Sequence, residues 1–506
     1  EPGLVSASDS QELVRAQRTS SRELPECLIE EEGADTTETG VESLTWKSEA
    51  DEQLRFSFPI MVSYICQTCI PLVTFLFVGR LDHHALAAAG LATMSANVAG
   101  WSVLVGLTSA LRTFCSQAYG AGNYHMVGVF VQRGVVVTST ASLPLALLFF
   151  FGGNILHEIG LPHSTTLLTG RYLKCLALTL WPYAWFQCMQ KWLQTLKYIW
   201  PIAIVAAVVV CISVPVNWLF IIHLGYGIDA APFMTLFAYL LLDSLLFGWI
   251  AWTGIYKDTL GRPTLEALQD MPAFLKVAVP GVFMTCLEWW GMEIVTLLSG
   301  RISKVALATQ SVIFQSNNFL FTLPLGLSVA TAVRVGHFLG NNRPVRAQRT
   351  VLVASVCVVV VMFSLAAVQI AARRYWGRIF TSDESVVKEV DHIILVTCLF
   401  EVLDGVVSVG SAVLRGAGRQ FFGAKLNAVA YWVVGLPLGY ALAFVADLGL
   451  FGLWCDYLTL VAPWCSRVLS QCHCMYLLCL CLSVCVSLSV HCLCLSLLCL
   501  SLSLSL

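Results

Sequence analysis

The sequence has little charge. Only 12% of its 506 residues are Asp, Glu, Lys or Arg, whereas 57% are hydrophobic. Soluble globular domains carry about twice that share of charged residues, so the composition indicates an integral membrane protein. Acidic residues are scarcest after the N-terminus, because 14 of the 31 lie within the first 52 positions. An acid inside the apolar part of the chain therefore needs a physical reason.

Several catalytic and nucleotide-binding motifs are also absent. The sequence contains no phosphate-binding Gly-rich loop, no HExxH and no GxSxG, which argues against a nucleotide-driven pump or a hydrolase of those types. A membrane-embedded enzyme that uses a glutamate as general base is the alternative from another class, but the ten His are scattered and offer no second catalytic group. We expect no enzyme activity, no cofactor, no metal site and no nucleic-acid partner.

The two ends of the chain differ from the middle. Residues 1–52 are acidic and poor in large apolar side chains, without a signal-peptide core, so we predict a disordered tail. The chain does not begin with Met, and we expect its start to be missing or processed. Residues 466–506 repeat Leu, Ser, Cys and Val without zinc-site spacing. We interpret this low-complexity tail as a gene-model or frameshift artefact.

Between these ends, apolar segments long enough to cross about 30 Å of hydrocarbon as helices recur. The predicted spans are 54–78, 86–111, 126–151, 165–190, 199–223, 231–255, 273–299, 306–333, 350–371, 388–413, 423–446 and 449–464, the last of them weakly defined. With the N-terminus in the cytoplasm, the inner loops hold more Lys and Arg than the outer ones, and the positive-inside rule favours this orientation. We expect a plasma-membrane or vacuolar/endomembrane location.

The two halves of the chain align with each other. At an offset of about 220 residues, the matches include Pro59 with Pro280, Gly79-Arg80 with Gly300-Arg301, Gly106-Leu107 with Gly326-Leu327 and Gly120 with Gly340. Each half, 53–258 and 259–465, would hold six helices and enter the membrane from the same side. The sequence thus predicts an all-α membrane protein with twelve transmembrane helices in two six-helix pseudo-symmetric lobes, suited to alternating access.

Four segments carry a family resemblance. They are "SALRTFCSQAYGAGN" (109–123), "CLEWWGMEI" (286–294), "PLGLSVATAVRVGHFLGNNRP" (324–344) and "LFEVLDGVVSVGSAVLRGAGRQ" (399–420). Together they resemble the eukaryotic branch of the multidrug and toxic compound extrusion family. The resemblance implies an antiporter that exports organic cations, drugs or metabolites in exchange for protons, or less typically sodium ions. The rival interpretations are a lipid or glycan flippase of related architecture and an inactive truncated paralogue.

The resemblance also implies which acids act. It assigns the central carboxylates to Glu288 and Glu401, and Glu293 matches a further family acid. A carboxylate at mid-bilayer costs about 2.5–3.5 kcal/mol on insertion scales, so such acids face a bundle interior or an aqueous cavity. Burial there favours the protonated form, which allows proton exchange near neutral pH.

Two further acids come from the residues themselves. Asp404 lies three residues after Glu401 on one helical face, so the pair should share protons, unless either acid only pairs with a nearby Arg or backbone amide. Asp243 is an intramembrane acid of the first half. It is either a second proton site or a partner of a Ser or Thr on a neighbouring helix.

Other positions bear on the substrate. Gln315 stands where animal members of the family commonly have a glutamate, and Arg112 replaces an acid often found there. We interpret Arg112 as an interface anchor at the cytoplasmic end of the second helix. Trp289, Trp290 and Tyr183, with Trp181 and Trp185, could offer aromatic faces to a cation, although aromatics are also ordinary packing residues. The expected partners are a small-molecule substrate, an organic cation by this argument, and the lipid bilayer around a monomer.

Overall fold

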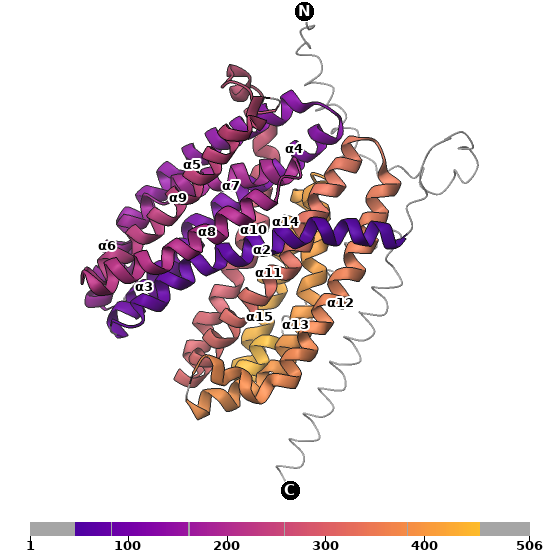
Figure 1. The fold of residues 1–506 in the computed structure, drawn as a ribbon. Coiled ribbons are helices and arrows are strands. Elements are labelled where there is room, and N and C mark those ends of the chain that lie inside the picture. The colour runs from indigo at the N-terminus through magenta and orange to yellow at the C-terminus, as the bar shows by residue number, and fades with distance from the viewer. Residues whose placement is uncertain (1–45, 82, 160–161, 258, 382, 456–506) are drawn as a thin grey trace, which may run out of the picture.

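The described part of the chain is helical throughout. The computed structural model describes residues 46–81, 83–159, 162–257, 259–381 and 383–455 (Figure 1). The helices of the first half are α2 (Trp46–Val78), α3 (His83–Ala96), α4 (Ser102–Gly120), α5 (Tyr124–Glu158), α6 (His163–Ala177), α7 (Leu180–Thr195), α8 (Trp200–Asn217) and α9 (Ala230–Thr253). Those of the second half are α10 (Met271–Ile302), α11 (Lys304–Gly340), α12 (Pro344–Trp376), α13 (Glu384–Gly416), α14 (Gln420–Asn427) and α15 (Leu436–Tyr440).

Ten helices of the described ranges are long and apolar enough to cross a membrane. Several combine two elements, because π-helical turns such as Asn97–Trp101 continue one helix into the next. The predicted span 165–190 is not one continuous helix, because the helix is interrupted between α6 and α7. Of the predicted span 449–464, residues 449–455 are helical and the rest lies outside the described residues. The count of twelve stays a prediction.

The N-terminal boundary of the fold lies earlier than predicted. Helix α2 begins at Trp46, so the prediction of a disordered tail is wrong for residues 46–52. Those residues are polar, but Glu49 and Gln53 find partners on α11 and α12, which offset the cost of ordering them. Residues 1–45 of the predicted tail, and the low-complexity residues 466–506, lie outside the described residues.

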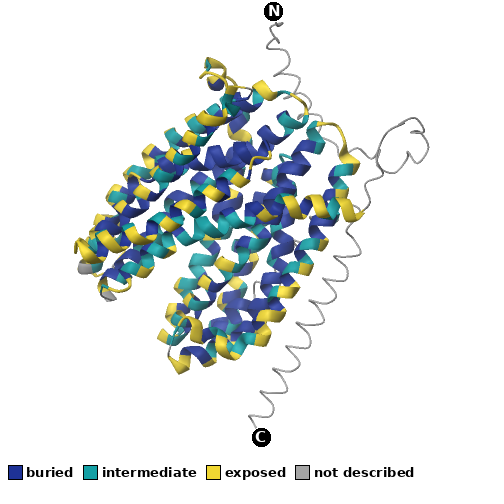
Figure 2. Cartoon of the chain, viewed as in Figure 1, coloured by how far each residue is buried: buried dark blue, intermediate teal, exposed yellow. Residues whose placement is uncertain are grey.

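Burial separates central helices from peripheral ones. The most apolar windows of the α3–α4 span, α11 and α13 are 78%, 72% and 83% buried, whereas those of α2 and α5 are each 22% buried. Figure 2 shows buried residues along the inner helices and exposed ones on outward faces and helix ends. Large apolar side chains such as Leu143 and Leu147 are 60% exposed, as expected for helix faces that meet lipid.

The two halves of the chain meet along α4 and α11. In Figure 1, helices of the first half lie on one side and those of the second half on the other, while α2 crosses toward α11 and α12. A Cβ added to Gly120 would lie 2.1 Å from the His337 carbonyl oxygen, and one added to Gly340 would lie 2.1 Å from that of Gln117. Only glycine permits this backbone approach. The aligned glycines of the internal repeat therefore form a reciprocal contact between the halves.

Candidate functional site

Three of the predicted acids lie close together on α10 and α13. Glu401 and Asp404 lie on one face of α13, and Asp404 is close enough to both Glu401 and Glu288 of α10 to interact electrostatically with them. Glu401 is buried, while Glu288 and Asp404 are half-buried. Carboxylates this close repel one another when they are ionised.

Glu401 is held by amide groups rather than by a cation. The Gln369 Nε2 atom of α12 donates to both carboxylate oxygens, at 2.9 and 3.2 Å. The Asn317 side chain of α11 donates to the same carboxylate in the amide orientation in which both its nitrogen and its oxygen have suitable partners. The Cys398 thiol in turn donates to Gln369 Oε1 at 2.8 Å. The alternative that Glu401 pairs with an arginine does not hold within the described residues.

A narrow crevice adjoins this amide cluster. It is too narrow to hold a water molecule and is lined by Ile313, Ser316, Asn317, Gln369, Trp376, Val390, Ile394 and Thr397. Sequence reasoning missed Gln369 and Asn317, although each is a polar amide inside a predicted apolar span. An amide inside an apolar span indicates that the amide needs a hydrogen-bond partner. It does not identify which acid is that partner.

The remaining predicted polar residues lie apart from this cluster. Within the described ranges, Glu293 is half-buried on α10 without a hydrogen bond or ion pair. Gln315 is exposed on α11 and likewise makes no hydrogen bond to the acids. Asp243 of α9 is buried, and neither of its carboxylate oxygens has a hydrogen-bond partner there. The alternative that Asp243 accepts a hydrogen bond from a Ser or Thr is therefore wrong for the described residues.

The predicted aromatic residues divide by environment. Trp289 is exposed, whereas the Trp290 indole donates to the Val98 carbonyl at 2.8 Å and so joins α10 to the first half. Tyr183 packs against Trp101 and Tyr239, with ring centroids 6.0 and 5.3 Å apart. The contacts of Trp290 and Tyr183 are packing contacts within the protein. Trp289 is 37% exposed.

The structure corrects the interpretation of Arg112. This side chain lies eight residues before the end of the His84–Gly120 span and is only 7% exposed, so neighbouring helices cover it. Its Nη2 atom donates to the Tyr64 hydroxyl at 3.0 Å. Arg112 is surrounded instead by other buried polar groups, among them Lys191 of α7 and Arg415 of α13. The sequence alone did not show that neighbouring helices cover this position near the helix end.

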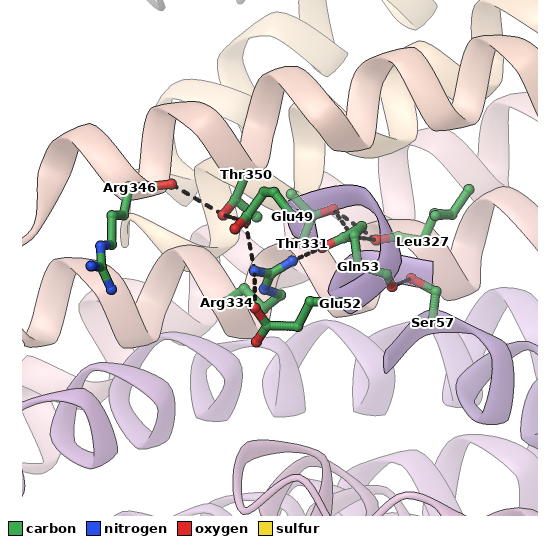
Figure 3. A network of polar contacts seen from close by, with 9 residues as sticks. All are labelled: Glu49, Glu52, Gln53, Ser57, Leu327, Thr331, Arg334, Arg346 and Thr350. Atoms are coloured by element: carbon green, nitrogen blue, oxygen red, sulfur yellow. Dashed lines mark hydrogen bonds and ion pairs between the residues drawn. The ribbon is translucent and has the colours of Figure 1, made fainter. Parts of the chain in front are cut away.

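A second polar cluster ties α2 to the second half of the chain. Figure 3 shows Arg334 of α11 between Glu49 and Glu52, at 2.6 and 3.1 Å, and Gln53 Oε1 accepts from its Nη1 atom at 2.9 Å. Thr350 of α12 donates to Glu49 at 2.8 Å. The Arg334 side chain is only 3% exposed. This cluster was missed because its acids were assigned to the tail.

Comparison with protein families gives a twofold match. Residues 59–219 and 280–441 both match the MatE family model, and together they cover more than half of the chain. The second segment begins 221 residues after the first. This is the offset at which Pro59 aligns with Pro280, so the match follows the internal repeat of the sequence.

Individual proteins resemble this chain over most of its length. It is 33% identical over 439 residues to Protein DETOXIFICATION 16 of Arabidopsis thaliana, covering 83% of this chain and 89% of the relative. It is 34% identical over 415 residues to Multidrug and toxin extrusion protein 1 of Oryctolagus cuniculus, covering 80% and 72%. The crystal structure of the eukaryotic MATE transporter AtDTX14 matches with a TM-score of 0.80 and 26% identity, over 87% of this chain and 99% of that one.

A bacterial structure is similar in fold alone. The Vibrio cholerae MATE transporter VcmN, as its D35N mutant, has a TM-score of 0.76 at 18% identity, over 85% of this chain and 97% of that one. The helical arrangement is thus shared beyond the range of close sequence similarity.

Proposed function

We propose that this chain, which belongs to the multidrug and toxin extrusion (MATE) family of transporters, exports organic cations, drugs or metabolites in exchange for protons. Family membership makes it an integral, multi-pass membrane transporter rather than an enzyme. In the proposed mechanism, two pseudo-symmetric lobes of six helices each, 53–258 and 259–465, alternate their access to the two sides. The fold it shares with AtDTX14 supports this architecture.

The observation that carries the proposal is the group of carboxylates formed by Glu288, Glu401 and Asp404. They lie on helices that are long and apolar enough to cross a membrane, and they interact with one another. A proton can occupy this group when the substrate leaves, and a cationic substrate can replace the proton. Gln369 fixes the Glu401 carboxylate by donating to both of its oxygens, which keeps the site in place during exchange.

Residues outside this group have supporting parts in the proposal. Asp243 would be a proton site of the first half, because its carboxylate is buried without a protein donor among the described residues. Trp289 would offer its exposed ring to a cation. Glu293 and Gln315 would lie near the substrate path rather than at the exchange site. We further propose a monomer with a cytoplasmic N-terminus in the plasma membrane or an endomembrane, and protons rather than sodium ions as the coupling ions.

The test is exchange by the full chain in proteoliposomes. An imposed pH gradient should drive uptake of tetraethylammonium, a sodium gradient should not, and Glu288→Gln should abolish the uptake. Uptake that follows the sodium gradient would contradict proton coupling. Movement of a fluorescent lipid between leaflets, without tetraethylammonium uptake, would favour the flippase instead.

A further inference from the structure

Two amide side chains present nitrogen, not oxygen, to the Glu401 carboxylate. Gln369 Nε2 of α12 donates to Oε2 at 2.9 Å and to Oε1 at 3.2 Å, and the Asn317 amide nitrogen of α11 donates to Oε1. Glu401 and Gln369 are 5% and 1% exposed, and Asn317 is half-buried. Gln369 and Asn317 are the amide cluster. They bring N–H donors from two helices to an acid on a third, α13.

Other contacts fix which end of each amide faces the acid. The Cys398 thiol donates to Gln369 Oε1 at 2.8 Å, so the oxygen of this amide is held away from Glu401. The Asn317 nitrogen also donates to the Ile313 carbonyl oxygen at 3.1 Å. Turning either amide over would place its oxygen against the carboxylate and lose these hydrogen bonds. Cys398 is 1% exposed and lies on the same helix as Glu401.

The amide cluster uses most of the acceptor positions of Glu401. An ionised carboxylate has about four lone-pair positions. Three N–H contacts reach this one, two at Oε1 and one at Oε2. Within the described residues, one position on Oε2 therefore stays open. A proton needs only one position, because it binds as the hydrogen of an O–H group.

A sodium ion has different requirements. Hard cations are held by several oxygen ligands, which come from carboxylates, carbonyls or water. The crevice beside the amide cluster is too narrow to hold a water molecule, so water cannot complete such a shell there. Of its lining residues, Ser316 accepts from the Trp376 indole at 2.9 Å, and the Gln369 oxygen accepts from Cys398. A cation at Glu401 would instead face the hydrogens of the two amides.

We infer that Gln369, Asn317 and Cys398 determine the ion specificity of Glu401, because they keep N–H donors on a carboxylate that then binds a proton but not a sodium ion. The inference rests on the proposed exchange function and assigns its choice of ion to named side chains. Gln369 and Asn317 select the ion directly, and Cys398 is a positioning residue that acts through Gln369. The two amides do not titrate, and α13 itself contributes Asp404 and Cys398 near Glu401.

The test compares two driving forces in proteoliposomes that contain the full chain. Initial tetraethylammonium uptake is measured with a sodium gradient alone and with a pH gradient alone, and the ratio of the two rates is the sodium-driven share. Gln369→Glu replaces the amide donor by a carboxylate of nearly the same shape. We expect it to raise this share at least about tenfold, since one hydrogen bond to a charged group can contribute that much. An unchanged share would overturn the inference.

Direct binding of sodium is the second measurement. Radioactive sodium is titrated onto the purified full chain at an alkaline pH, where protons compete least with it. This measurement reports on Gln369→Glu even if that variant does not transport. We expect displaceable sodium in the variant and only background in the unmodified protein. Sodium that binds the unmodified protein and is lost in Glu401→Gln would show that the amide cluster admits the ion, and would refute the inference.

Cys398 variants test the orientation of the amide. Cys398→Ala removes the donor that holds the Gln369 oxygen, so the amide can turn that oxygen toward a cation, and the sodium-driven share should rise several-fold. Cys398→Ser keeps a donor and should retain the unmodified share. Cys357→Ala is the matched control, because Cys357 lies about 18 Å from Gln369 along α12. Equal shares in Cys398→Ala, Cys398→Ser and Cys357→Ala would contradict the positioning role.

The outcomes separate this inference from the proposed function. If a pH gradient drives uptake by the unmodified protein, but Gln369→Glu shows neither sodium-driven uptake nor sodium binding, the inference is wrong and the export function stands. If neither gradient drives uptake by the unmodified protein, while Gln369→Glu alone binds sodium, the amide cluster has the inferred specificity and the export function fails.

Discussion

At the scale of single residues, α10 offers two glutamates with different surroundings. Glu288 lies near Asp404 and Arg415, whereas Glu293 has no hydrogen bond or ion pair among the described residues. Five residues of helix turn one about 140° away from the other. We predict that Glu288→Gln lowers proton-driven exchange to background while Glu293→Gln leaves a substantial part of it.

The measurement is initial uptake in proteoliposomes that contain equal amounts of each variant. Glu293→Gln is the matched control, since it makes the same chemical change in the same helix. If both variants lose exchange equally, both acids face the substrate path. If Glu288→Gln transports like the unmodified protein, Glu288 is not a proton site.

Asp404 allows a prediction about pH. It interacts with both Glu288 and Glu401, so the three groups titrate together over a broader pH range than one group would. Asp404→Asn removes one member and should narrow the pH range over which exchange changes from minimal to maximal. Exchange measured over a pH series decides the matter. An unchanged profile would place Asp404 among the structural residues.

At the scale of helices, the contact of α4 with α11 depends on glycine. A Cβ at position 120 would meet backbone at 2.1 Å, and backbone cannot move aside as a flexible side chain would. We predict that Gly120→Ala destabilises the protein by about 1–3 kcal/mol, the usual range for overpacking, and slows exchange. Thermal unfolding in detergent and uptake report the two effects.

Gly248→Ala is the control for that substitution. Gly248 lies in α9, and an added Cβ would meet nothing within 4 Å. Alanine there should be neutral or stabilise by up to about 1 kcal/mol, because glycine is a poor helix former. Gly120→Ala behaving like this control would show that α4 and α11 are not tightly packed.

At the scale of the whole molecule, α2 connects the two halves through Arg334. Glu49→Gln should leave that arginine with only the half-exposed Glu52 as a charged partner. Breaking a buried pair costs about 3–5 kcal/mol when no partner remains. We predict a loss of stability at or below the lower end of that range, measured as a lower unfolding temperature.

Asp51→Asn provides the comparison on the same helix. Asp51 pairs with Arg55 at 3.4 Å, and their side chains are 64% and 83% exposed. Exposed pairs contribute about 0–1 kcal/mol, so this variant should unfold nearly as the unmodified protein does. A larger effect from Asp51→Asn than from Glu49→Gln would contradict the role of α2 as a link between the halves.

The sequence by itself determined the properties that depend on composition and order along the chain. Scarce charge and long apolar runs require membrane-spanning helices, since only internally hydrogen-bonded segments are stable in hydrocarbon. The repeat that pairs Gly120 with Gly340, and the motif around Glu288, were visible without coordinates. Family, fold class and the acids worth testing followed from them.

Only the tertiary structure decided what each polar side chain meets. Helical spacing placed Glu401 and Asp404 on one face, but the donors of Gln369 and the position of Glu288 come from other helices. Arg112 and Glu49 were misassigned for the same reason: a charged residue near a predicted helix end is solvated or buried according to neighbours far away in sequence. Burial and charge pairing are properties of the packed molecule, because the partners approach only when the helices assemble.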